Sequence, residues 1–134
     1  MAVETRVPIK HEADIVTARQ QGRALASQLG FSNIDQTFIA TAISEVARNI
    51  IVYARSGEII LTAVQRNGGK SGIVIIARDE GPGISDIMRA MQNGYSTTNS
   101  LGLGLPGAKR MMDEFEIVSE VGKGTTITMK KWKQ

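Results

Sequence analysis

The chain has 134 residues, of which 42% are apolar and 22% charged, and its formal net charge is +3. This size and balance suit one globular domain with a real core. The absence of cysteine excludes disulfides, a thiolate nucleophile and cysteine-ligated zinc, and it is compatible with a reducing cytosol. Aromatic residues make up only 4%, so nucleic-acid binding is not expected. No stretch resembles a signal peptide or is long enough to span a membrane, so we expect a cytoplasmic protein without a membrane partner.

The N-terminal segment predicts a strand followed by a helix. Residues 3–9 alternate between apolar and polar side chains, and Pro8 in this run favours an edge strand. Such an edge could pair between two copies, so a homodimer is possible. The helix is predicted from a cap at Asp14 to Gly30. His11 lies at the junction, where a solvated or capping role is expected in preference to a catalytic one.

A longer helix is predicted to start near Ser32 and to run to about Tyr53, with an apolar stripe at helical spacing. Glu45 and Asn49 are one turn apart on one side of that stripe, where a carboxylate and an amide can face a cleft. Arg48 is predicted to point to the outer face. The alternative is that this pair is simply the solvated flank of an amphipathic helix.

Two predicted strands follow, at residues 59–64 and at an apolar run that ends at Asp79, joined by a hairpin at residues 67–70. Asp79 begins the sequence Asp-Glu-Gly-Pro-Gly. Its carboxylate could accept a hydrogen bond from a ligand amine, and Gly81 and Gly83 would let the backbone approach that ligand. The alternative is an ordinary turn after a strand.

The remaining chain predicts a loop, a helix and a hairpin. After a weak helical piece at residues 86–91, residues 93–100 are polar and indicate either a linker or a lid. The glycine-rich stretch 102–107 opens a helix predicted over 105–114, whose free N–H groups would suit phosphate. Strands are predicted at residues 115–120 and 125–132.

These elements predict an α+β fold in a single domain, residues 1–134. With two hairpins, the sheet should be mostly antiparallel or mixed, covered on one face by helices as a two-layer sandwich. Other nucleotide-binding motifs are excluded. A P-loop would need an earlier glycine and a following helix, and a Rossmann site would need a strand directly before Gly102. The motifs of eukaryotic-type protein kinases are missing.

Four motifs occur in a fixed order: Glu-x-x-x-Asn at 45–49, Asp-x-Gly-x-Gly at 79–83, Gly-Leu-Gly-Leu at 102–105 and Gly-x-Gly-Thr at 122–125. Together they resemble the signature of the GHKL ATPase/kinase superfamily, which has the Bergerat ATP-binding fold. Residues 41–49 and 102–115 more closely resemble the RsbT-like serine/threonine switch kinases of the bacterial stressosome. These are related to the anti-sigma-factor kinases of the RsbW and SpoIIAB type.

The resemblance implies a site for ATP and Mg²⁺. Asp79 would accept a hydrogen bond from the exocyclic amine of adenine, Gly81 and Gly83 would make room for the base, and Thr125 would support the same end. Asn49 would hold Mg²⁺ through its side-chain oxygen, with phosphate oxygens and waters as the other ligands.

The same resemblance implies a phosphate cradle, a lid and a catalytic base. Glu45 would orient or deprotonate the attacking hydroxyl. Gly102, Gly104 and the N-terminus of the following helix would cradle the phosphates, and residues 96–101 would close as the lid. The binding residues of this segment would be Ser100, Leu101, Gly102, Leu103 and Gly104. His11 is in the wrong context for autophosphorylation, which disfavours a two-component histidine kinase.

For function, the resemblance implies a Mg·ATP-dependent protein serine/threonine kinase whose substrates are STAS-domain proteins of a stressosome. On release it would switch to a downstream output enzyme such as a PP2C-type phosphatase. The alternative is an anti-sigma factor that binds a sigma factor and phosphorylates an anti-anti-sigma factor. A third possibility, an ATPase piece of a larger machine, is disfavoured because no second domain is visible.

Overall fold

The computed structural model describes residues 4–66, 68–83, 91 and 104–133. The strands are β1 (Glu4–Ile9), β2 (Gly57–Arg66), β3 (Lys70–Asp79), β4 (Glu114–Glu120) and β5 (Gly124–Trp132). The helices are α1 (Glu12–Gln28), α2 (Asn33–Tyr53) and α4 (Gly104–Met111). The helix predicted at 86–91, the polar loop at 93–100 with its predicted lid, and the predicted binding residues 100–103 lie outside the described residues, apart from Met91.

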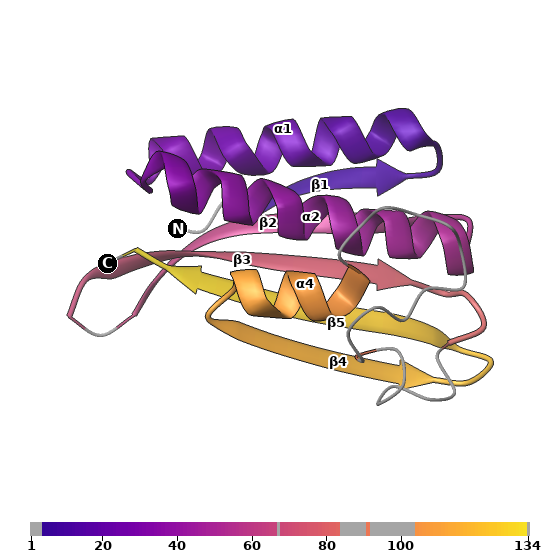
Figure 1. Ribbon diagram of the computed structural model, residues 1–134. Helices are drawn as coiled ribbons and strands as arrows, with labels where there is room; N and C mark the ends of the chain where they lie inside the picture. Colours follow the sequence, from indigo (N-terminus) through magenta and orange to yellow (C-terminus); the bar gives the residue numbers. More distant parts are fainter. Residues whose placement is uncertain (1–3, 67, 84–90, 92–103, 134) are drawn as a thin grey trace.

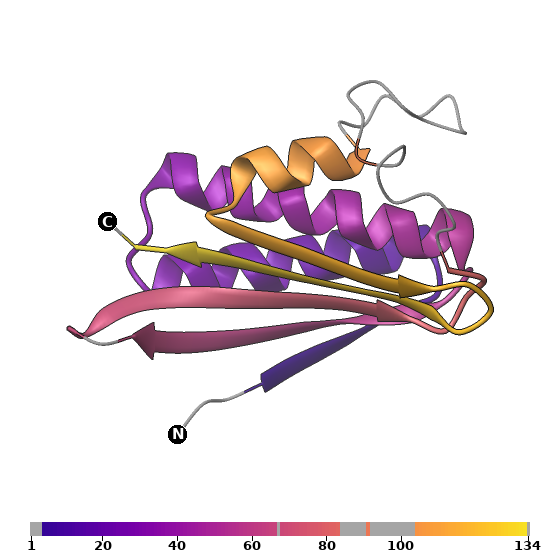
Figure 2. The ribbon, with the colours of Figure 1, turned by 90° about the horizontal axis from the view of Figure 1, so that it is seen from below.

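The strands form one five-stranded sheet in the order β1-β2-β3-β5-β4. Every neighbouring pair is antiparallel. Figures 1 and 2 show the helices of the described residues, α1, α2 and α4, on one face of this sheet, so the predicted two-layer α+β sandwich is confirmed. β1 is an edge strand, as Pro8 indicates, while its pairing with a second copy stays a prediction.

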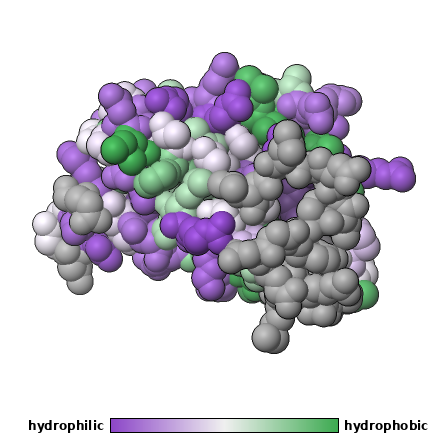
Figure 3. Space-filling view, in the orientation of Figure 1, coloured by the Kyte–Doolittle hydropathy of each residue, from purple (hydrophilic) through white to green (hydrophobic). Residues whose placement is uncertain are grey.

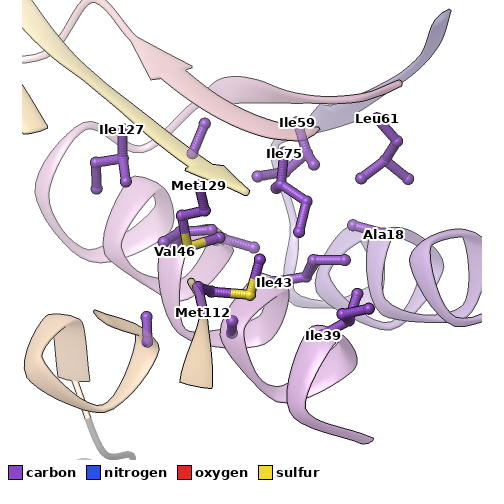
Figure 4. Close-up of a cluster of buried hydrophobic side chains, with 14 of the residues drawn as sticks. Ala18, Ile39, Ile43, Val46, Ile59, Leu61, Ile75, Met112, Ile127 and Met129 are labelled. Carbon is purple, nitrogen blue, oxygen red and sulfur yellow. The ribbon is translucent and has the colours of Figure 1, made fainter. Parts of the chain in front are cut away.

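The core lies between the helix layer and the sheet (Figure 4). Apolar side chains on one stripe of α2 meet inward-facing side chains of the central strands, and both sets are almost fully buried: Ile39, Ile43, Val46, Ile59, Leu61, Ile75, Ile127 and Met129. Gly22 lets α1 approach α2 closely, because a Cβ there would collide with Ile43. No helix among the described residues is long and apolar enough to cross a membrane.

The two long helices begin at polar caps. At α2 the prediction is confirmed, because the Ser32 hydroxyl accepts a hydrogen bond from the N–H of Asp35 at 3.1 Å. At α1 the N-cap is the exposed His11, which confirms the capping role expected for it, whereas the prediction of Asp14 as the cap was wrong because Asp14 lies inside the first turn. The Asp14 carboxylate accepts hydrogen bonds from the N–H of Lys10 (2.8 Å) and of His11 (2.9 Å). These two bonds hold the pKa of Asp14 below its ordinary value.

Helix α4 ends at Met111, three residues before the predicted end at Glu114. The Nζ of Lys131 donates to the carbonyl of Met111 at 2.9 Å and so satisfies the end of the helix. The N–H of Asp113 already donates to the carbonyl of Lys130 at 2.9 Å, which joins the chain to the sheet. Contacts with β5, distant in sequence, therefore set this boundary.

Candidate active site

Several sequence-predicted site residues gather at one end of the sandwich. Figure 1 shows the C-terminal end of α2, the end of β3, the start of β5 and the N-terminal end of α4 at the right of the molecule, and Figure 2 agrees. These four chain segments carry Asn49, Asp79, Thr125 and Gly104, with Glu45 one turn further back on α2. The fold thus brings together residues that are far apart in the sequence.

Asp79 is the last residue of β3 and is 8% exposed. Its Oδ1 accepts a hydrogen bond from the N–H of Gly81 at 2.9 Å, which orients the carboxylate. Its neighbours on the adjacent strands are Gly57 of β2 and Thr125 of β5. A Cβ at Gly57 would lie 2.9 Å from the Cγ2 of Ile50 and 3.1 Å from the Cβ of Asp79. Gly57, which the sequence analysis missed, therefore lets the C-terminal end of α2 lie directly beside Asp79.

The glycines after Asp79 fit into a narrow space. A Cβ at Gly81 would lie 2.5 Å from the Cβ of Ala54, just past the end of α2. Gly83 has a positive φ of 78°, and a Cβ there would lie 2.5 Å from the carbonyl oxygen of Glu120. The loop is thus wedged between α2 and the turn that joins β4 to β5. Packing alone explains why both positions are glycine, so their presence is not evidence for the predicted contact with a nucleobase.

Thr125 is 5% exposed and faces the helix layer beside Asp79. Its Oγ1 lies 2.8 Å from the Oγ of Ser119 on β4. Ser119 also donates to the carbonyl of Gly124 at 3.2 Å. Gly124 itself has a φ of 130°, and a Cβ there would collide with the carbonyl of Asp79. Ser119 is a second residue that the sequence analysis missed, because only the β4–β5 register brings it to Thr125.

On α2, Glu45 is buried and Asn49 is half-buried, as expected for the border of the core. The predicted outward position of Arg48 was wrong: its Nη1 lies 3.8 Å from the Oε1 of Glu45, whose side chain is 6% exposed. Three residues advance an α-helix by about 300°, which returns Arg48 to the side of Glu45. The arginine therefore gives a buried carboxylate a partner of opposite charge.

The N-terminal end of α4 completes the described part of the site. Gly104 begins the helix with a φ of 67°, and Pro106 occupies the first turn, where it has no N–H to leave unpaired. Among the described residues, no group of three or more His, Cys, Asp or Glu side chains could hold a metal ion. An amide oxygen such as that of Asn49 can still be one ligand of Mg²⁺ when phosphates and waters supply the others.

The fold and the comparisons with known proteins define an ATP-binding domain of the GHKL type. The histidine kinase-like ATPase domain family matches residues 9–131, so the chain belongs to that family. It is 54% identical to the serine/threonine-protein kinase RsbT of Bacillus subtilis over 94% of each chain. It is also 34% identical to an anti-sigma F factor of Thermoanaerobacter, covering 86% of this chain and 82% of the relative.

Solved structures support the fold. The structure of the RsbU and RsbW domains of Rv1364c from Mycobacterium tuberculosis superimposes with a TM-score of 0.65 at 20% identity, covering 100% of this chain and 33% of that one. The mycobacterial sensor histidine kinase MprB gives a TM-score of 0.55 at 18% identity over 98% and 99%. The chain is therefore an ATP-dependent kinase of the GHKL superfamily, and the predicted fold and enzyme class are confirmed.

Proposed function

We propose that the chain transfers the γ-phosphoryl group of Mg·ATP to a serine or threonine of a STAS-domain protein. The observation that carries this proposal is the gathering of Glu45 and Asn49 of α2 with Asp79 and Thr125 of the sheet at one end of the sandwich. The 54% identity to RsbT, a serine/threonine-protein kinase, supports the choice of acceptor.

In this proposal the adenine end of the site is built on β3 and β5. Asp79 accepts a hydrogen bond from the 6-amino group of adenine, a charge-assisted bond worth about 1.5–3 kcal/mol. Its fixed orientation supports this role, because the Gly81 N–H already binds one carboxylate oxygen. Gly81 and Gly83 bring the backbone close to the base, and Thr125 contacts the same end.

The phosphate end lies between α2 and α4. Asn49 supplies an amide oxygen to Mg²⁺, which neutralises phosphate charge when it is bound. The N-terminal turn of α4 at Gly104 offers backbone N–H groups and the positive end of a helix dipole to the phosphates. The roles of residues 96–101 as the lid and of Gly102 in the phosphate cradle stay predictions.

Glu45 acts as the general base. Its carboxylate takes the proton of the acceptor hydroxyl, the hydroxyl oxygen bonds to the γ-phosphorus, and the bond to the leaving ADP oxygen breaks. Such a base contributes roughly 10²–10⁴ in rate. The contact of Glu45 with Arg48 supports the role, because the ion pair helps to orient the carboxylate.

Partner choice would follow phosphorylation. The kinase binds unphosphorylated STAS proteins, leaves them when they carry phosphate, and then binds an output enzyme such as a PP2C-type phosphatase. The 34% identity to anti-sigma F factors supports a second candidate, a protein that sequesters a sigma factor and phosphorylates an anti-anti-sigma factor. Co-purification of a sigma factor, in place of a STAS assembly with an output enzyme, would favour the second candidate.

The test is phosphate transfer from Mg·ATP to a purified cognate STAS protein, with acid-stable phosphoserine or phosphothreonine as the readout. Glu45→Ala should lose transfer by about 10²–10⁴ while binding ATP normally. Because Glu45 is buried, Glu45→Gln serves as a variant of equal volume, and Glu116→Gln on exposed β4 is the matched control. Unchanged transfer in Glu45→Gln would show that Glu45 is not the base. If the wild-type chain binds ATP but transfers no phosphate to the STAS protein, the proposal that it phosphorylates this STAS protein is rejected.

A further inference from the structure

Ser119 lies next to the adenine end of the site without being one of the motif residues. It stands opposite Thr125 in the β4–β5 ladder, on the face that the helices cover. Its Oγ lies 2.8 Å from the Oγ1 of Thr125 and 3.2 Å from the carbonyl oxygen of Gly124. Asp79 is the neighbour of Thr125 on the other side, so three strands contribute one polar group each to a continuous row.

One arrangement of the protons lets both of these bonds form at once. In it the Ser119 hydroxyl donates its single proton to the carbonyl of Gly124, which only accepts hydrogen bonds. The proton between the two hydroxyls then comes from Thr125. With its own proton directed at Ser119, the Thr125 oxygen presents lone pairs to any other group. A carboxylate such as that of Asp79 beside it also only accepts hydrogen bonds.

We propose that Ser119 is a positioning residue that makes the Thr125 hydroxyl an acceptor and thereby selects 6-amino purines over 6-oxo purines. Two neighbouring acceptors suit the amino group of adenine and repel the O6 atom of hypoxanthine or guanine. Without Ser119, the Thr125 proton is free to turn toward O6, while Asp79 accepts from the N1–H of a 6-oxo base. This inference rests on the proposed placement of adenine at Asp79.

A purely structural role predicts a different result. Hydrogen bonds between hydroxyls on facing strands also stabilise hairpins, typically by a fraction of a kcal/mol. Loss of such support would loosen the β4–β5 hairpin and weaken both classes of nucleotide alike. The ratio of the two affinities therefore separates nucleobase selection from hairpin support.

The experiment measures the binding of Mg·ATP and Mg·ITP by calorimetry, since inosine differs from adenosine only in the 6-oxo group and the N1–H. In Ser119→Ala, the preference for ATP over ITP should fall by about three- to tenfold, the range of one neutral hydrogen bond. Ser119→Thr keeps the hydroxyl and should keep the preference. Thr128→Val, which removes a hydroxyl on the opposite face of β5, should leave it unchanged.

Equal weakening of ATP and ITP in Ser119→Ala, or an unchanged ratio, would overturn the inference. Asp79→Asn distinguishes this failure from that of the proposed adenine site. If Asp79→Asn weakens ATP binding while Ser119→Ala leaves the ratio unchanged, only the role of Ser119 is wrong. If Asp79→Asn leaves ATP binding unchanged, adenine does not lie at Asp79 and both proposals fail.

Discussion

Asp79 and Lys131 are buried charged residues on neighbouring strands, and they lie at opposite ends of the sheet. The Asp79 carboxylate receives one hydrogen bond that the structure specifies, from the N–H of Gly81. An ionised carboxylate can accept about four. It is oriented by the fold and keeps acceptor capacity for a ligand.

Lys131 is held by three kinds of contact from the helix layer. Its Nζ donates to the carbonyl of Met111 at 2.9 Å, lies 3.9 Å from the Oδ1 of Asp35, and lies 5.5 Å from the centre of the Phe38 ring. Its side chain is 11% exposed. These contacts complement the charge from within the protein, which is typical of a structural role.

The comparison teaches that burial of a charge does not by itself indicate a functional site. The same helix, α2, serves both ends: its N-terminal turn helps to hold Lys131, and its C-terminal turns line the site at Asp79. Figure 3 shows apolar surface over the N-terminal end of α2, at the left, where Ile34 and Phe38 are exposed. What differs between the two ends is how completely protein groups satisfy the charge.

Among the effects expected from this comparison of the two ends, the largest concerns the Asp79 end. Asp79→Asn should weaken ATP binding by about tenfold or more, because it removes a charge-assisted hydrogen bond to adenine. The melting temperature should change little, since an amide oxygen can still accept from Gly81. Calorimetric titration with Mg·ATP measures the affinity, and Glu80→Gln, an exposed neighbour, is the control. An unchanged affinity would contradict the adenine assignment.

The Lys131 end should show the opposite pattern. Lys131→Met should lower the free energy of unfolding by about 1–3 kcal/mol, because the Met111 carbonyl and Asp35 lose their partner. ATP affinity of the folded protein should stay within about twofold. Urea denaturation measures the loss. The control is Lys130→Met on the opposite face of β5, because the ion pair of Lys130 with Glu114 is longer and more exposed than that of Lys131 with Asp35. A strong loss of ATP affinity without a loss of stability in Lys131→Met would contradict the structural role of Lys131.

The smallest effect is expected at Asp14, a carboxylate whose hydrogen bonds from Lys10 and His11 lower its pKa. A lowered pKa in the folded state stabilises the fold above the pKa of the unfolded chain, and this contribution is lost as the pH falls through the folded value. Asp14→Asn should therefore lower the melting temperature slightly at pH 7. The difference from the wild type should shrink below about pH 4. A difference that is constant from pH 7 to pH 3 would contradict the charge-based explanation.

Local patterns in the sequence predicted most elements. Apolar periodicity gave α2 and the central strands to within a few residues, and Ser32 marked the start of α2 correctly. The end of α4 was misplaced because hydrogen bonds from Lys131 and to Lys130 decide it, and no local pattern contains them. The position of Arg48 was a misjudged helical angle, which the sequence alone could have corrected.

By itself, the sequence determined the two-layer fold, the family and the position of Asp79 at the end of a strand, because these depend on local periodicity and on short motifs. The tertiary structure decided which polar groups become neighbours. The strand order and register place Thr125 between Asp79 and Ser119, and Gly57 makes room for α2 beside them. Such contacts join residues far apart in the chain. Strand pairing and side-chain packing fix them, and local propensity does not encode either.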